Sequence, residues 1–157
     1  MVHEKTLVII KPDAVNRGLI GEIVSRFEMK GLKIVAMKME IIKSEILESH
    51  YEHHKGKGFF AELVKFMSSV PSVILVLEGK EAVKVARKMC GNTNGRDAEQ
   101  GTIRGDFSMS VQNNLIHASE SVEIAQKEIA RFFKEEEITV FKQIDFDYLY
   151  SEGEKKV

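Results

Sequence analysis

Residues 91–120, GNTNGRDAEQGTIRGDFSMSVQNNLIHASE, decide the fold. They follow a clear helix, and near their end they contain the short apolar run that must supply the last strand. Up to Asn114 it shows no sustained period of 2 or 3.6, which predicts a loop with one short helical turn. A connection this long inside a compact chain is usually functional or disordered. The pattern alone leaves both interpretations open.

The same segment is rich in groups that bind anions, which favours the functional interpretation. The donors are the backbone amides of four glycines and the side chains of Thr93, Arg96, Arg104, Asn113 and Asn114. Two apolar residues then lead to His117. A loop rich in anion donors that ends on a histidine points to phosphoryl chemistry.

The composition predicts one domain, residues 1–157. Of the 157 residues, 43% are hydrophobic and 30% are charged, as in ordinary globular proteins. The net charge of −1 provides no general affinity for nucleic acid or membrane, so any anion site must be local. The single cysteine, Cys90, excludes an internal disulfide framework. The first residues lack a signal-peptide layout, and we expect a cytoplasmic protein without a membrane partner.

The first half of the chain predicts two strands and three helices. Residues 6–10 form a continuous β-rich run, typical of a strand buried on both faces. Apolar residues from Ile20 to Phe27 follow a helical period that Gly31 closes. Residues 33–42 alternate, which predicts a strand with one apolar face composed of Val35, Met37, Met39 and Ile41. Ser44 is a candidate N-cap for the next helix, and residues 60–67 form another.

The second half completes the architecture. It predicts a strand at 73–77, a helix at 81–90 and a helix at 122–133, and it leaves only residues 115–118 for a fourth strand. The tail after Asp147 is polar and is expected to be mobile. The predicted fold is α/β (α+β): a ferredoxin-like sandwich, a four-stranded antiparallel sheet with helices packed on it.

Several side chains allow both a structural and a functional interpretation. His50, His53 and His54 share one predicted helix, and we prefer a polar helix face to a zinc site because no further ligand completes the set. Arg87 continues an apolar stripe and is either a surface arginine or a ligand group. Glu128 lies beside the apolar stripe of the last helix, where a half-buried carboxylate usually needs a partner.

The motifs together resemble one family. KPDAVNRGLIGEI, GFF at 58–60, ARKMCGNTN, GTIRGDF and NNLIHASES occur in the order and spacing of nucleoside diphosphate kinase, and the likeness runs from about Lys5 to Phe133. The resemblance implies transfer of the γ-phosphate from a nucleoside triphosphate, mainly ATP, to any nucleoside diphosphate. It further implies a ping-pong route through phosphohistidine, a requirement for Mg²⁺, a role in maintaining nucleotide pools and a homo-oligomer, which in this family is mostly a hexamer; no nucleic acid is required.

The resemblance also assigns roles by position. His117 matches the nucleophile, and Glu128 matches the acid that hydrogen-bonds the other ring nitrogen. Lys11 is expected both to assist catalysis and to bind the nucleotide. The other expected nucleotide-binding residues are Tyr51, Phe59, Arg87, Thr93, Arg104, Val111 and Asn114, with Phe59 and Val111 on either side of the base. We expect no protein metal ligand, because Mg²⁺ is held mainly through the phosphates.

The sequence departs from the family pattern at few positions. Glu120 replaces the more frequent aspartate, and Gly95 and Gly58 stand where many members have proline. The acid after the tyrosine is Glu52, one residue nearer than usual, and His53 occupies the customary position. These departures put the subunit contact near Gly95 and any indirect metal contact in doubt.

Two other classes of protein are less consistent with the sequence. An RNA-binding module on the same fold requires an aromatic strand and a basic face, which we do not find. An inactive relative would lack the histidine or a phosphate-binding cation, and all of them are present.

Overall fold

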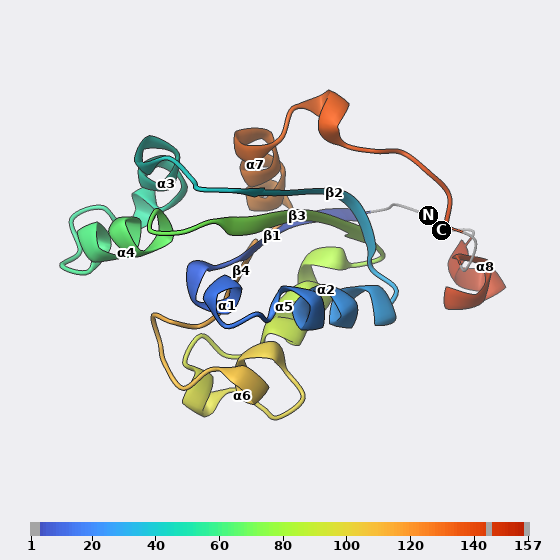
Figure 1. The fold of residues 1–157 in the computed structure, drawn as a ribbon. Helices are drawn as coiled ribbons and strands as arrows, with labels where there is room; N and C mark the ends of the chain where they lie inside the picture. Colours follow the sequence, from blue (N-terminus) through green and yellow to red (C-terminus); the bar gives the residue numbers. More distant parts are fainter. Residues whose placement is uncertain (1–3, 144–145, 156–157) are drawn as a thin grey trace.

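A four-stranded antiparallel sheet forms the centre of the computed structural model, which describes residues 4–143 and 146–155. The strands run in the order β2-β3-β1-β4 (Figure 1). Their bounds are β1 Glu4–Ile10, β2 Lys33–Glu40, β3 Ser72–Gly79 and β4 Ile116–Ala118. The predicted ferredoxin-like fold is confirmed, including the short fourth strand after the long loop.

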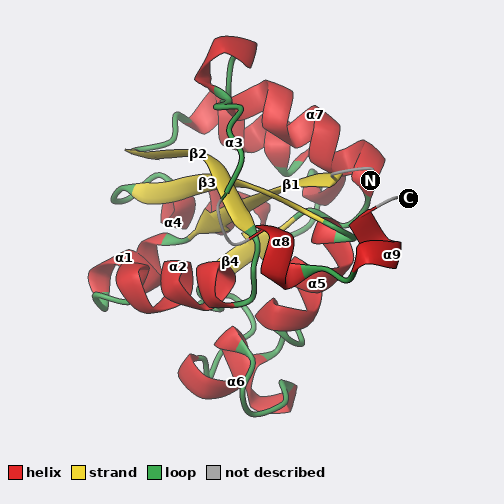
Figure 2. Ribbon diagram, turned by 90° about the vertical axis from the view of Figure 1, so that its right-hand side faces the viewer, coloured by secondary structure: helices red, strands yellow, loops and turns green. Residues whose placement is uncertain are grey.

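Helices cover both faces of this sheet (Figures 1 and 2). The lower layer in Figure 1 contains α1 Pro12–Asn16, α2 Ile20–Met29 and α5 Ala82–Cys90. The other layer contains α3 Ser44–His50, α4 Phe60–Met67 and α7 Val122–Phe132. Outside these layers lie α6 Ile103–Phe107, α8 Phe146–Leu149, α9 Glu152–Lys155 and the 3₁₀ turns Glu52–His54, Gly95–Asp97 and Glu135–Glu137.

The central strand β1 contributes to both cores, as its continuous apolar sequence predicts. Leu7 and Ile9 face α3 and α7, while Val8 and Ile10 face α2 and α5, and all four are fully buried. Ile9 pairs with His117 on β4. Because side chains alternate along a strand, the neighbours of His117 turn to the α5 face and His117 itself turns to the α3 and α7 face.

The predicted apolar face of β2 is wrong. The pairing with β3 shifts between Ile34 and Ala36, so an extra residue at this β-bulge reverses the alternation. Val35 is buried, whereas Met37, Met39 and Ile41 are 57%, 55% and 58% exposed. The strand also ends at Glu40 rather than at residue 42. These three large apolar side chains are therefore exposed along an edge strand.

One smaller prediction needs correction, and the polar tail contains two short helices. Ser44 is the first residue of α3 and not its N-cap, which is Lys43 without a side-chain hydrogen bond. The tail forms α8 and α9, and Leu149 packs so closely on Gly31 that a Cβ there would lie 2.8 Å from the leucine Cδ2. Gly31 has φ +90° and ends α2 as predicted. Within the described ranges, no helix is long and apolar enough to cross a membrane.

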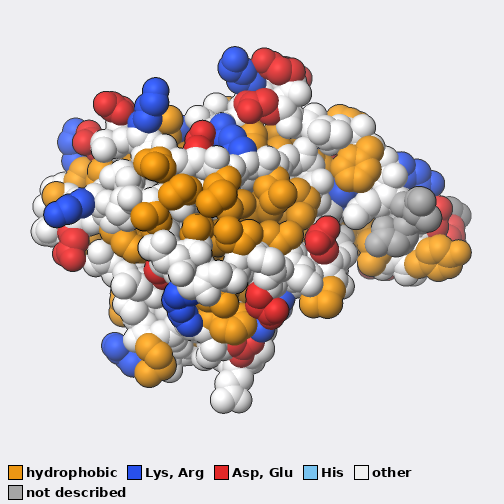
Figure 3. All heavy atoms as spheres, in the orientation of Figure 1, with side chains coloured by type: hydrophobic (Ala, Val, Ile, Leu, Met, Phe, Trp, Pro, Cys, Tyr) orange, Lys and Arg blue, Asp and Glu red, His pale blue; other side chains and the backbone are white. Residues whose placement is uncertain are grey.

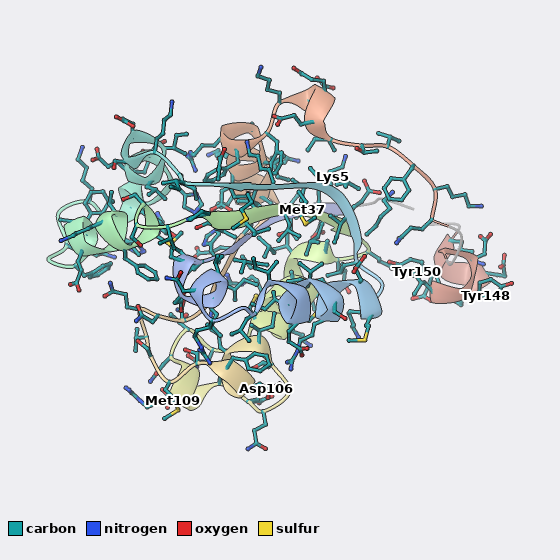
Figure 4. All side chains as sticks on the ribbon, in the orientation of Figure 1. Lys5, Met37, Asp106, Met109, Tyr148 and Tyr150 are labelled. Atoms are coloured by element: carbon teal, nitrogen blue, oxygen red, sulfur yellow. The ribbon has the colours of Figure 1, made fainter. Side chains whose placement is uncertain are left out.

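The long segment before β4 is a folded arm and not a disordered loop (Figure 1). It contains two helical turns where one was predicted, the 3₁₀ turn Gly95–Asp97 and α6. Arg26 on α2 binds Asp106 with a separation of 2.6 Å between Nη1 and Oδ2. A Cβ at Gly95 would lie 2.4 Å from the carbonyl oxygen of Ser108, so the arm packs through this glycine. Figure 4 shows Asp106 and Met109 on this arm, far from Tyr148 and Tyr150 at the other end.

A hydrogen bond from the start of the chain fixes the entry to β4. Leu115 has φ +71°, a conformation that residues other than glycine rarely adopt. Its amide donates to Oδ2 of Asp13 over 3.0 Å, and its carbonyl accepts from the amide of Lys11 over 2.9 Å. Asp13 in α1 therefore holds the turn that presents His117.

We expect Asp13→Ala to lower the free energy of unfolding by about 1–3 kcal/mol, because the amide of Leu115 loses its acceptor. Asp13→Asn keeps an acceptor oxygen and should lose much less. Urea unfolding of both variants at equal protein concentration tests this. Equal losses in the two variants would contradict the role given to this hydrogen bond.

Candidate active site

His117 occupies the middle of β4, and a carboxylate on α7 fixes its ring. Its Nε2 lies 3.0 Å from Oε1 and 3.1 Å from Oε2 of Glu128. A carboxylate only accepts, so Nε2 carries the hydrogen and Nδ1 keeps its lone pair in the neutral ring. In the described part of the chain, no hydrogen bond reaches Nδ1. The arrangement leaves Nδ1 as a nucleophilic nitrogen.

Ser119 supports the same carboxylate, and our sequence analysis missed it. Its hydroxyl donates to Oε2 of Glu128 over 2.6 Å, and its Oγ accepts from the amide of Leu7. Burial opposes the ionised form of Glu128, but the hydrogen bonds from His117 and Ser119 hold its pKa below the usual value. The signal was available: Ser119 follows His117 by two residues, and alternation along a strand places both on one face.

Two arginines donate to the carbonyls on either side of His117. Nη2 of Arg104 donates to the carbonyl of Ile116 over 2.6 Å, and Nη1 of Arg87 donates to that of Ala118 over 3.4 Å. Arg104 also donates to the carbonyls of Asn114 and Gly91. Three of its five N–H groups are thus used by the backbone, and two remain for a ligand. Arg87 is exposed and lines a groove of about 560 Å³ beside the start of α7.

Lys11 provides the third cation, at the end of β1. Its ammonium donates to Oδ1 of Asn114 over 2.7 Å, and the side chain is buried. Burial and the nearby charge of Arg104 lower the pKa of Lys11 to about 8, although Asp13 raises it. Asp13 offsets only part of the unfavourable effect of burial and of Arg104 on this charge, and an anionic ligand would offset more.

The remaining predicted residues divide into buried and open groups. The Asn114 amide donates to the carbonyls of Thr93 and Val111, which ties the arm to β4. Tyr51 is buried beside His117, with ring centroids 6.3 Å apart and no hydrogen bond to its hydroxyl in the described structure. Phe59 and Val111 are 44% and 53% exposed. The structure gathers five of the predicted residues near His117: Lys11, Tyr51, Arg87, Arg104 and Asn114. The Thr93 side chain is exposed, and Phe59 and Val111 lie at the surface.

The preferred interpretation of the three histidines is wrong for one of them. His53 lies at the surface and His54 is half-buried, but His50 is buried against His117 and is not part of a polar face. His50, His117 and Glu128 offer ligand atoms that all lie within 4.8 Å of one another. The hydrogen bond between His117 and Glu128 already uses two of these groups, so the trio fits a hydrogen-bonded pair with an adjacent imidazole better than a metal site.

Comparisons with known proteins agree on one family. The sequence profile described as nucleoside diphosphate kinase matches residues 4–138. The chain is 55% identical over 153 residues to the nucleoside diphosphate kinase of Pyrococcus horikoshii, covering 96% of this chain and 97% of that protein. It is 50% identical over 149 residues to that of Archaeoglobus fulgidus, covering 95% and 99%.

Solved structures agree with the sequence relatives. The structure of a halophilic nucleoside diphosphate kinase from Halobacterium salinarum in complex with CDP superposes with a TM-score of 0.93 at 41% identity. The match covers 96% of this chain and 100% of that chain.

We expect the affinity for ADP to fall as the pH rises from 7 to 9. The free protein has a Lys11 pKa of about 8, so this ammonium loses its charge across that range while ADP stays anionic. Calorimetric titration at constant ionic strength measures the affinity at each pH. Lys11→Arg, which stays charged, should flatten the decline. An equally steep decline in Lys11→Arg would show that another group causes it.

Proposed function

This chain belongs to the nucleoside diphosphate kinase family, and we propose that it moves the γ-phosphate of a nucleoside triphosphate, mainly ATP, to nucleoside diphosphates in two steps through His117. The observation that carries this proposal is the hydrogen bond from Nε2 of His117 to Glu128, which leaves Nδ1 free. The cations near His117, which are Lys11, Arg87 and Arg104, support it, since they fit the phosphate chain of a nucleotide.

In the first step, the lone pair of Nδ1 attacks the γ-phosphorus. The new bond is N–P, and the P–O bond to the β-phosphate breaks with its electron pair leaving on the nucleoside diphosphate. Nε2 keeps its hydrogen and its bond to Glu128, whose negative charge balances the positive charge that develops on the ring. In the second step, a β-phosphate oxygen of another nucleoside diphosphate attacks the same phosphorus, and the N–P bond breaks.

The cations act on the charge of the transferring group. Phosphoryl transfer has a loose transition state with charge on its oxygens, so positioning and positive charge provide most of the acceleration. Lys11, Arg87 and the two uncommitted N–H groups of Arg104 are the donors available for this purpose. No Gly-rich phosphate loop is needed when three separate elements deliver these charges.

The donor set fits Mg²⁺ that arrives on the nucleotide. Mg²⁺ prefers oxygen ligands and commonly binds through substrate phosphates. Within the described residues, Glu128 is the one carboxylate in the candidate metal group, and His117 and Ser119 already occupy it. Bound to the phosphate oxygens, Mg²⁺ would neutralise part of their charge, while Lys11 and the arginines orient the phosphates.

The open apolar residues support a broad tolerance for the base. Phe59 offers an exposed ring, and Val111 an exposed aliphatic side chain. Stacking on a ring is worth roughly 1–3 kcal/mol per base and does not depend on base identity. With such an acceptor range, the proposed cellular role is to maintain the pools of nucleoside and deoxynucleoside triphosphates in the cytoplasm.

The exposed β2 edge supports a homo-oligomer, which we propose to be a hexamer. Met37, Met39 and Ile41 are all more than half exposed. Figure 3 shows apolar side chains across the middle of the face where β2 lies in Figure 1, and Figure 4 places Met37 there. Apolar patches of this kind on an edge strand usually mark contacts between chains.

Incubation with γ-labelled ATP and Mg²⁺ tests the phosphoryl transfer. We expect a label on the protein that resists alkali, is lost in acid, and leaves on addition of GDP. His117→Ala should remove it, because the nucleophile is gone. Glu123→Gln, on the exposed face of α7, is the matched control and should label normally. Labelling and turnover by His117→Ala would exclude this residue as the carrier.

Light scattering at micromolar protein concentration tests the assembly. We expect an oligomer for the unmodified chain and a smaller species for Met37→Glu/Met39→Glu, because two carboxylates in an apolar contact cannot be desolvated cheaply. Met29→Glu changes a methionine that is 76% exposed on α2 and is the control. A monomeric unmodified chain, or an unchanged mass in the double variant, would contradict the proposal.

A further inference from the structure

His50, the last residue of α3, is a buried titratable group directly behind His117 and has no role in the mechanism above. Its side chain is 0% exposed. The rings of His117 and Tyr51 meet it edge-on with centroids 4.6 Å away, and the ring of Phe132 meets it at 5.3 Å. A histidine with such contacts packs like an aromatic residue, but it also has two ring nitrogens to satisfy.

Arg131 determines which nitrogen of His50 carries the hydrogen. Nη1 of Arg131 lies 3.3 Å from Nδ1 of His50. A guanidinium only donates, so Nδ1 accepts and the ring is neutral, with its hydrogen on Nε2. Burial, together with the charges of His117 and Arg131, lowers the pKa of His50 to about 2. His50 is therefore a permanent acceptor for Arg131 at any physiological pH.

The hydrogen bond brings a positive charge to the catalytic carboxylate. Nδ1 of His50 lies 3.7 Å from Oε1 of Glu128, the oxygen that also binds His117. Since Nδ1 has no hydrogen to offer, His50 itself does not stabilise this carboxylate. Arg131 is three residues after Glu128 on α7, and its charge is one of the influences that keep the Glu128 pKa low. Arg131 is only partly buried, so it needs an anchor to stay there.

We propose that His50 is a positioning residue for phosphoryl transfer: its Nδ1 holds the guanidinium of Arg131 beside the His117–Glu128 pair, so that the pair resists protonation and Nδ1 of His117 stays nucleophilic to lower pH. The inference rests on the proposed function only in taking His117 as the reacting group. Its electrostatic part concerns the nucleotide-free protein and is testable there.

The other charged groups around His50 do not provide the same effect. His53 from the 3₁₀ turn and Lys11 from the end of β1 also disfavour a charge on His50. Burial and the charge of Glu128 raise the pKa of Tyr51. None of these groups is hydrogen-bonded to His50 in the described structure, so exchanging His50 should leave them in place. Arg131 is the cation whose position depends on Nδ1.

Two amide variants separate the acceptor from the packing. In His50→Asn, the amide oxygen can occupy the region of Nδ1 and accept from Arg131, whereas the longer side chain of His50→Gln carries its amide toward the region of Nε2. A ¹⁵N NMR titration of the His117 ring in nucleotide-free protein reports proton uptake by the pair. We expect His50→Asn to titrate like the unmodified protein and His50→Gln to titrate roughly one pH unit higher, since a nearby opposite charge typically shifts a carboxyl by 1–3 units.

Arg131→Gln tests the same link from the other side. It should raise the titration of the pair as much as His50→Gln does, and the double variant should add nothing further, because both changes remove one interaction. The acid limb of kcat/KM should move with the NMR titration in each variant. Arg131 lies near the surface, so this variant remains informative even if His50→Gln folds poorly.

Three outcomes would overturn the inference: an unchanged titration in Arg131→Gln, additive shifts in the double variant, or a titration in His50→Asn as altered as in His50→Gln. Failure of the proposed function looks different. In that case His117 of the unmodified protein takes no label from ATP, although the NMR titration in the variants proceeds as before.

Discussion

The carboxylate of Glu128 is the constraint on which the rest of the site depends. It is buried, and it accepts from Nε2 of His117 and from the hydroxyl of Ser119. A buried charge is tolerated only when its hydrogen-bonding capacity is satisfied, and leaving it unpaired would cost several kcal/mol. The same bonds that make the carboxylate tolerable therefore fix α7 against β4. The hydrogen bonds that stabilise the buried charge are therefore the same ones that orient the His117 ring.

Lys11 and Arg104, which are proposed to bind phosphate, lie in surroundings that disfavour their charged forms. Burial lowers the pKa of both Lys11 and Arg104; the charge of Arg104 lowers that of Lys11 further, and the charge of Arg87 lowers that of Arg104. In the nucleotide-free chain, Asn114 accepts from Lys11 and backbone carbonyls accept from three N–H groups of Arg104, and the other donors stay available. An anionic ligand would offset this repulsion, and the loss of the repulsion would contribute to the free energy of binding. The arm that contains α6 serves this purpose because it brings Arg104 to β4.

The sequence predicts those features that depend on local pattern. The buried run of β1, the helix closed by Gly31 and the motif around His117 all follow from residues adjacent along the chain. The bulge in β2 does not, because it depends on pairing with β3, and one inserted residue moved Met37 to the uncovered face. The sequence did not predict the burial of His50 for a related reason: its surroundings include Arg131 and His117, which are distant in sequence.

The proposed site is buried at Lys11 and Asn114 and exposed at Phe59 and Val111. This difference governs which parts of a nucleotide the site can distinguish. Lys11 and Asn114 are buried and bonded to each other, so the proposed phosphate position tolerates little displacement. Phe59 and Val111 are exposed, and an apolar contact has no direction that would select one base edge over another. Under the proposed function, discrimination between ligands therefore falls on the phosphate chain. For the same reason, Gly58, which has no atom within 4 Å of a Cβ position, can replace the usual proline beside Phe59 without disturbing the chemistry at His117.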